Sequence, residues 1–144
     1  MPWTDETATA VALPHRNAWA SLTRGFTGRC PHCGQGKLFG AFLKVTDRCE
    51  ACDEDFSHQR ADDFPAYLVI LIVGHILVPI ALFVETEFSP SYPVQLAVWL
   101  PLALVLSLAL LQPVKGAIVG LQWALRMHGF GVLPDADAMP GQEH

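Results

Sequence analysis

Formal charge is absent from two long stretches of the 144-residue sequence, residues 66–84 and residues 94–112. Each stretch has nineteen residues. A helix of that length covers about 28 Å, close to the hydrocarbon thickness of a bilayer. The alternative is a buried helix of a soluble protein, but two such runs in so short a chain argue against it. The sequence therefore predicts an α-helical membrane protein built on a hairpin of two transmembrane helices.

Lysine and arginine are absent from the link between these stretches, residues 85–93, which carries Glu85 and Glu87. Basic residues lie before the first stretch and after the second: Arg16, Arg24, Arg29, Lys37, Lys44, Arg48 and Arg60, then Lys115 and Arg126. Because basic residues collect on the cytoplasmic side of membrane spans, we expect both termini in the cytoplasm and the link outside.

Residues 1–20 also lack an apolar core long enough for a cleavable signal. We predict a mobile segment over residues 1–28 and a disordered tail over residues 131–144. The apolar residues, 51% of the chain, are concentrated in the two stretches. The remainder is too small for a large core and needs a staple. The net charge of −5 argues mildly against a nucleic-acid partner.

Only four cysteines occur, and they can supply that staple. They form the pattern C-x2-C-x15-C-x2-C: Cys30, Cys33, Cys49 and Cys52. Zinc takes four thiolates at tetrahedral angles, and two Cys-x-x-Cys turns deliver two each. We therefore predict an N-terminal cytoplasmic zinc ribbon of short β-strands over residues 29–60. Four protein ligands leave no open position, which predicts a structural Zn²⁺ ion.

Other interpretations of the cysteines fit less well. Disulfides are disfavoured because thiols stay reduced in the cytoplasm. A redox Cys-x-x-Cys needs a thioredoxin-like context that this sequence lacks. His32 and His58 lie near the two pairs and are alternative ligands, but four cysteines already complete the site.

The predicted hairpin, residues 61–112, holds one ionisable residue at mid-span. His75 lies at the centre of the first stretch, where such a group is costly and is a functional candidate. Pro79 removes the amide that would bond the carbonyl of His75. In the structural interpretation, a neutral His75 bonds Ser107 or a freed carbonyl. In the functional interpretation, it ligates haem or copper, or contacts a membrane partner.

Two carboxylates, Asp62 and Asp63, precede the first stretch. An aspartate at this position is expected to cap the helix N-terminus, and negative charge suits that end of the helix dipole. Pro65 fits the first helical turn. One cap leaves the second carboxylate only partly explained, so the pair is also a candidate contact for a cation or a basic partner.

Residues 113–130 are predicted to form a C-terminal amphipathic helix at the cytoplasmic interface of the membrane. One face of this helix is apolar: Val114, Ile118, Leu121 and Leu125. Such a helix lies in the plane of the interface, with Trp123 expected near the headgroups. Gly116 and Gly120 form a GxxxG pair, which would allow close helix approach.

Three segments cover most of residues 29–130: CPHCGQGKLFGAFLKVTDRCEAC, ADDFPAYLVILIVGHILVP and QPVKGAIVGLQWALRMHGF. In combination they resemble a bacterial membrane family known as domain-of-unknown-function family 983. Asp53 departs from that family, whose members usually have glycine after the last cysteine. The resemblance implies a multi-pass protein of the bacterial inner membrane. Family members are often encoded among cytochrome c oxidase genes, which implies a role in oxidase biogenesis.

We therefore expect a non-enzymatic membrane adaptor or assembly factor, because the sequence offers no nucleophile–base–orienter set. Its expected partners are the lipid bilayer and a membrane protein complex, with cytochrome c oxidase subunits or assembly proteins as candidates. A nucleic-acid partner is not expected, and a homo-oligomer stays open. The alternative is a membrane-embedded cofactor-handling protein or enzyme that uses His75 as a haem or copper ligand or as an acid–base group.

Overall fold

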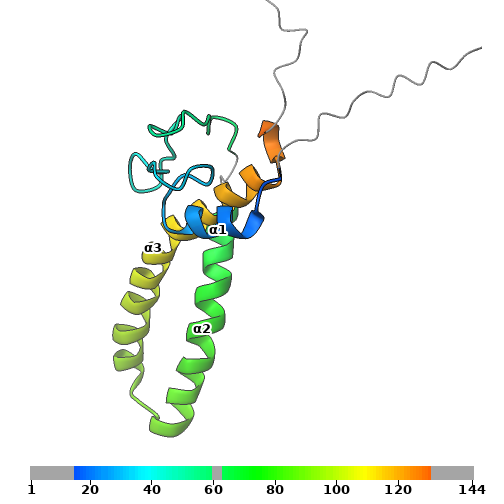
Figure 1. The fold of residues 1–144 in the computed structure, drawn as a ribbon. Coiled ribbons are helices and arrows are strands. Elements are labelled where there is room, and N and C mark those ends of the chain that lie inside the picture. The colour runs from blue at the N-terminus through cyan, green and yellow to red at the C-terminus, as the bar shows by residue number, and fades with distance from the viewer. Residues whose placement is uncertain (1–14, 60–62, 131–144) are drawn as a thin grey trace, which may run out of the picture.

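The computed structural model describes residues 15–59 and 63–130. Its helices are α1 (Ala18–Phe26), α2 (Phe64–Phe88), α3 (Tyr92–Ala124) and the 3-10 helix η1 (Met127–Gly129). Helices α2 and α3 form a long hairpin, and α1 crosses one end of it beside the loops of residues 27–59 (Figure 1). The predicted C-terminal tail, the first fourteen residues and Asp62 lie outside the described residues.

Helix α1 occupies a segment that the sequence analysis leaves unstructured. The side chain of Asn17 accepts hydrogen bonds from the amides of Trp19 and Ala20, at 3.1 and 3.2 Å, which satisfies two of the amides that begin the helix. Ser21 and Gly25 are buried against α3. The prediction of a mobile segment is therefore wrong for residues 18–26, because packing on α3 holds this short helix in place.

Helices α2 and α3 contain both predicted spans and extend beyond them, so the link shrinks to residues 89–91. Pro65 lies in the first turn of α2, as predicted. Asp63 precedes that turn, but its side chain forms no capping hydrogen bond. Its backbone is already close to helical, with φ −94° and ψ −16°, whereas a capping residue is typically extended. The predicted cap is wrong for Asp63.

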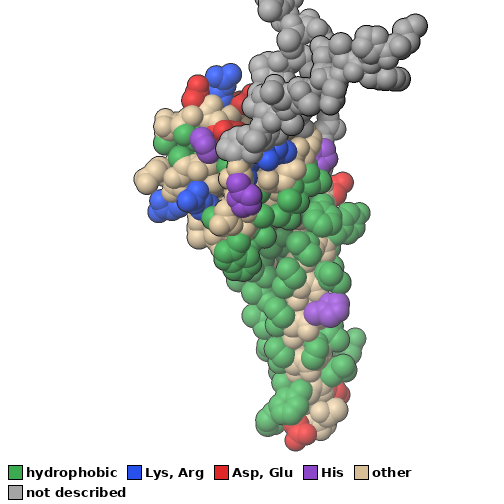
Figure 2. Space-filling view, turned by 45° about the vertical axis from the view of Figure 1, so that its right-hand side comes forward, with side chains coloured by type: hydrophobic (Ala, Val, Ile, Leu, Met, Phe, Trp, Pro, Cys, Tyr) green, Lys and Arg blue, Asp and Glu red, His purple; other side chains and the backbone are tan. Residues whose placement is uncertain are grey.

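The hairpin presents a largely apolar surface along its length (Figure 2). Both helices are long and apolar enough to cross a membrane, and in their most apolar windows only 11% of α2 and 0% of α3 is buried. Contact between them is confined to a narrow seam that includes Val69, Val73 and Val114. The core helix of a soluble protein would be mostly buried, so this exposure favours an apolar surrounding.

Helix α3 continues through Pro113 to Ala124, and Figure 1 shows its last turns crossing behind α1. Val119 and Trp123 are 0% and 5% exposed, and Ala124 is also buried. These side chains pack against the loops of residues 27–59. A separate interfacial helix is therefore not confirmed. The expected place of Trp123 near lipid headgroups is wrong, because the protein itself covers the indole.

Glycine makes the crossing of α1 and α3 possible. A Cβ atom at Gly116 would lie 2.9 Å from the carbonyl carbon of Gly25 and 3.1 Å from the ring of Phe39. A Cβ atom at Gly120 would lie 3.0 Å from the carbonyl carbon of Ser21. Real Cβ atoms do not approach backbone this closely. The predicted close approach at the GxxxG pair is confirmed, and its partner is the short helix α1.

Candidate metal centre

Residues 27–59 form loops held by three isolated antiparallel bridges: Arg29 with Lys37, Phe39 with Val45, and Arg48 with Asp55. No strand occurs in the part of this region that the structure describes. The predicted short β-strands are therefore corrected to single bridges. Only a few residues lie between the cysteine turns and the next chain reversal, so each ladder ends after one pair.

The two cysteine pairs sit in turns of the same construction. The amide of Gly34 donates to the carbonyl of Cys30 at 2.8 Å, and the amide of Asp53 donates to the carbonyl of Cys49 at 2.9 Å. Gly34 and Asp53 both have left-handed backbone, with φ of 70° and 60°. Glycine adopts this conformation without a Cβ penalty, whereas aspartate does so at some cost. Asp53, which stands where the family usually has glycine, thus occupies a backbone conformation that glycine adopts most easily.

The two turns bring all four sulfur atoms together. Sγ of Cys30 lies 3.6 Å from Sγ of Cys52, and Sγ of Cys33 lies 3.7 Å from Sγ of Cys49. All four sulfurs lie within 4.8 Å of one another, and no pair is joined as a disulfide. A tetrahedral zinc site with Zn–S bonds of about 2.3 Å has edges of about 3.8 Å. The donor set and its spacing fit one tetrahedral metal ion.

Backbone amides point at two of the sulfurs. The amide of Gln35 donates to Sγ of Cys33 and the amide of Ala51 to Sγ of Cys49, each at 3.4 Å. Hydrogen bonds from the backbone at Gly36 and Gln35 lower the pKa of Cys33 to about 6, because they favour the thiolate. Burial raises the pKa of Cys30 well above its usual range. Without metal, Cys33 is therefore the first of these two to ionise.

Gly36 is part of this site, although the sequence analysis assigns it no role. Its carbonyl accepts a hydrogen bond from the amide of Cys30 at 2.8 Å. A Cβ atom added at Gly36 would overlap Sγ of Cys49 and lie 3.6 Å from Ala51. The signal in the sequence is the second glycine of CPHCGQG, two residues beyond the one that completes the first turn.

Neither histidine considered as an alternative ligand joins the sulfur cluster. The ring of His32 lies 5.4 Å from the indole of Trp123, and its Nδ1 is 3.6 Å from the carboxylate of Glu54. The ring of His58 meets Phe130 edge-on at 6.1 Å. Both imidazoles serve packing around the end of α3.

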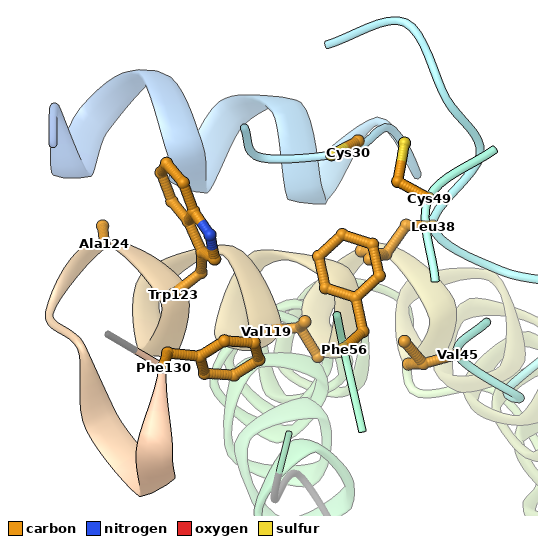
Figure 3. Packing of buried hydrophobic residues seen from close by; sticks show 9 residues of the cluster. All are labelled: Cys30, Leu38, Val45, Cys49, Phe56, Val119, Trp123, Ala124 and Phe130. Atoms are coloured by element: carbon orange, nitrogen blue, oxygen red, sulfur yellow. The ribbon is translucent and has the colours of Figure 1, made fainter. Parts of the chain in front are cut away.

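The cysteines and the end of α3 share one core (Figure 3). Its buried members come from both parts of the chain: Cys30, Leu38, Val45, Cys49, Phe56, Val119, Trp123, Ala124 and Phe130. Nε1 of Trp123 donates to Glu54 at 2.9 Å, and Nζ of Lys115 donates to the carbonyl of Leu43 at 2.7 Å. The metal centre is thus joined to α3 through packing and hydrogen bonds.

Arg16 completes the joint from the N-terminal side. Its Nη1 donates to the carbonyl of Trp123 at 2.7 Å, and its guanidinium lies 4.1 Å from the centre of the indole ring. That carbonyl, which also accepts a hydrogen bond from the amide of Arg126 at 3.2 Å, lies in the last turn of α3, where positive charge is favourable. Sequence reasoning missed this contact because the two residues lie 107 positions apart.

The two candidate intramembrane residues are not brought together. His75 is exposed, and its Nδ1 lies 2.8 Å from the carbonyl oxygen of Leu71, one turn earlier in α2. Ser107 lines an apolar groove of about 400 Å³ between α2 and α3, together with Gly74 and Ala103. The predicted bond between His75 and Ser107, or between His75 and a carbonyl freed by proline, is wrong. Val69 and Val73 form the inner face of α2, and His75 lies on another.

The predicted carboxylate pair remains a prediction. Asp63 is exposed, and Asp62 lies outside the described residues.

Comparison with known proteins identifies a family for most of this architecture. The family described as "Protein of unknown function (DUF983)" matches residues 39–123, which include Cys49 and Cys52, α2 and nearly all of α3. Cys30 and Cys33 precede the matched region, although the structure places them beside the second pair. No curated protein and no solved structure matches the chain. The match covers more than half of the chain, and the protein belongs to the DUF983 family.

Proposed function

We propose that the protein spans the bacterial inner membrane through α2 and α3, with both termini in the cytoplasm. The exposed apolar surface of the hairpin supports this proposal, because water would make it costly to maintain. Helix α2 has 25 residues and covers about 37 Å, more than a bilayer's hydrocarbon core requires. The basic residues flanking the spans support the orientation.

The metal ion in this proposal is Zn²⁺, with a structural role. Cys30, Cys33, Cys49 and Cys52 would hold it, since four thiolates in a tetrahedron select zinc or iron–sulfur chemistry. Zinc bound by four protein ligands offers no position to a substrate. Its contribution is to the folding of a module whose apolar core is small.

We further propose that this module is a non-enzymatic adaptor or assembly factor. The single observation that carries the proposal is the shared core of the cysteine cluster and α3, which fixes the module at the end of the hairpin. Such an arrangement suits simultaneous contact with a membrane complex and a cytoplasmic partner. A cytochrome c oxidase under assembly is the first candidate complex, on the resemblance alone.

The test is recovery of partners from native membranes. The tagged full chain is purified in mild detergent beside a Cys33→Ser/Cys52→Ser variant and a Ser107→Ala control, which leaves the cysteines intact. We expect oxidase subunits or assembly proteins with the parent chain and the control, and loss of partners or of the protein itself in the cysteine variant. Full partner recovery by a stable cysteine variant, or recovery of the chain alone in all cases, would contradict the adaptor proposal.

One observation favours the cofactor-handling alternative. A carbonyl oxygen only accepts hydrogen bonds, so the contact with Leu71 places the proton of His75 on Nδ1. In the neutral tautomer with this proton, Nε2 keeps its lone pair, which is the state that ligates haem or copper. The alternative predicts a visible chromophore or bound copper in the purified protein that disappears in His75→Leu. An unchanged spectrum and metal content in that variant would exclude it.

A further inference from the structure

A cavity of about 420 Å³ opens between α1, the first cysteine turn and the end of α3. Its lining includes four side chains that carry or can carry positive charge, together with polar groups: His15, Arg16, Asn17, Ser21, Arg24 and His32. Among the residues that the structure describes, no acidic one lines it. The cavity is thus distinct in charge from the apolar grooves of the hairpin.

The two arginines are held in place by the backbone, not by carboxylates. Nη1 of Arg24 donates to the carbonyls of Pro31 and His32, at 3.2 and 3.0 Å. Nη1 of Arg16 donates to the carbonyl of Trp123. A guanidinium has five N–H donors in a planar fork, and these bonds use one terminal nitrogen of each. The remaining N–H donors of both guanidinium groups can bind a ligand. Because the backbone bonds already restrict both side chains, binding would cost little further side-chain entropy.

A second guanidinium group, that of Arg126, lies close enough to Arg16 to affect its charge. Burial and the neighbouring Arg126 lower the pKa of Arg16, and Glu54 acts against this lowering. The carboxylate of Glu54 accepts a hydrogen bond from the indole of Trp123 and lies 3.6 Å from the imidazole of His32. These two contacts are local to Trp123 and His32. An anion in the cavity would be favoured by the guanidinium groups of Arg16 and Arg24 together.

We propose that this cavity binds the phosphate group of a phosphate ester. The planar guanidinium group of arginine can donate two parallel hydrogen bonds to two phosphate oxygens, whereas the ammonium group of lysine acts as a point charge. The phosphate can belong to a phospholipid headgroup or to a soluble phosphorylated compound, and both present the same oxygens. The proposal does not depend on the adaptor proposal, because the two arginines that would bind the phosphate, Arg16 and Arg24, are neither sulfur ligands nor part of the hairpin.

The experiment reads the arginines directly. Zinc-loaded full-length protein with ¹⁵N-labelled arginine is titrated in neutral detergent with inorganic phosphate, and separately with a short-chain phosphatidylglycerol, at fixed ionic strength. The Nε–H signals of Arg16 and Arg24 are followed, with Arg48 as an internal control on the far cysteine turn. Saturable shifts of the first two with phosphate identify a soluble ligand. Saturable shifts with the phospholipid only identify a headgroup.

Matched variants separate recognition from general attraction. Arg24→Gln and Arg48→Gln remove the same charge, and Arg24→Lys keeps the charge but removes the fork. We expect about tenfold weaker binding in Arg24→Gln and no more than about twofold change in Arg48→Gln. If Arg24→Gln, prepared separately with uniform ¹⁵N labelling, loses its α1 amide signals, Arg24→Lys carries the test and should also bind more weakly, as read from Arg16. Absence of saturable shifts with both probes, or equal loss in the Arg24 and Arg48 variants, would overturn the proposal.

Discussion

Replacing Gly116 by alanine tests whether the crossing of α1 and α3 holds the metal module in place. The added Cβ would lie 2.9 Å from the carbonyl carbon of Gly25 and 3.1 Å from the ring of Phe39. The first neighbour is backbone and cannot rotate away, so α1 must move off α3. Overpacking of this kind costs about 1–3 kcal/mol. Alanine also stabilises a helix by about 0.5–1 kcal/mol relative to glycine, which leaves a net loss of roughly 1–2 kcal/mol.

The chain offers a matched control in Gly74, which also lies inside a helix. A Cβ atom there meets nothing within 4 Å. Gly74→Ala should therefore show only the gain in helix propensity, about 0.5–1 kcal/mol. The two variants make the same chemical change, and they differ only in what the new methyl group meets.

Hydrogen exchange of the α1 amides in detergent-solubilised protein measures the effect, because local opening of α1 exposes them. A loss of 1–2 kcal/mol predicts exchange faster by about 5- to 30-fold in Gly116→Ala. The Gly74→Ala protein should exchange these amides at the parent rate. Unchanged exchange in Gly116→Ala, or equal acceleration in both variants, would refute the role of the glycine crossing.

Three further predictions concern the sulfur cluster. In metal-free protein, alkylation of Cys33 should rise with pH around a midpoint of about 6, because the thiolate is the reactive form, while Cys30 stays unreactive. Mass spectrometry measures alkylation at both cysteines. A shared midpoint near 9 would contradict the effect of the backbone amides on Cys33. Gly36→Ala should abolish stoichiometric zinc binding, because the added Cβ would overlap a ligand sulfur. Gly40→Ala is the control and should retain zinc, because its Cβ meets Thr46 at an ordinary 3.4 Å. Metal analysis measures both, and equal zinc content in the two variants would refute this prediction. Asp53→Gly should relieve the left-handed backbone strain and stabilise the zinc-loaded module by about 0.5–1 kcal/mol, measured as slower zinc loss to a chelator; faster loss would show that the exposed pair with Arg48 matters more.

The sulfur cluster could be predicted because its signal is local. Each Cys-x-x-Cys turn is defined by neighbouring residues, and the chain between the pairs is short enough that one ion can collect both. The strands could not be predicted correctly, because the composition of residues 37–45 suits a strand whether or not a partner lies beside it. Phe42 shows the limit: it is half exposed, whereas Phe56 is buried in the core.

The place of Trp123 could not be predicted, for a related reason. An apolar helix face has the same period whether lipid, a helix or a loop covers it. The partner of the GxxxG pair was equally hidden, since Gly25 resembles a helix breaker and proves to be the contact point of α1. Both errors concern contacts between residues far apart in the sequence, such as Trp123 and Glu54 at 69 positions, which local patterns do not encode.

The error at His75 comes from neglecting rotation about the axis of α2. Val73 lies on the inner face of α2, and two residues further along a helix correspond to a rotation of about 200°. His75 therefore points away from α3, although its neighbour Gly74 lines the same groove as Ser107. The clue in the sequence was the spacing of Val69, Val73 and Leu77, which marks the seam at every fourth residue.

The cysteine-containing loops of residues 27–59 have a fixed orientation relative to the hairpin. Helix α3 passes without interruption from the hairpin into the core that contains the cysteines, and the distance from Gln112 to Trp123 along its axis is about 16 Å. Three contacts then fix rotation about that axis: the glycine crossing, the bond of Lys115 to Leu43, and the bond of Trp123 to Glu54. A flexible linker would let the module sample many positions. Here, if the four cysteines hold the proposed zinc ion, its loss would disturb a core that also contains Val119 and Trp123 of α3.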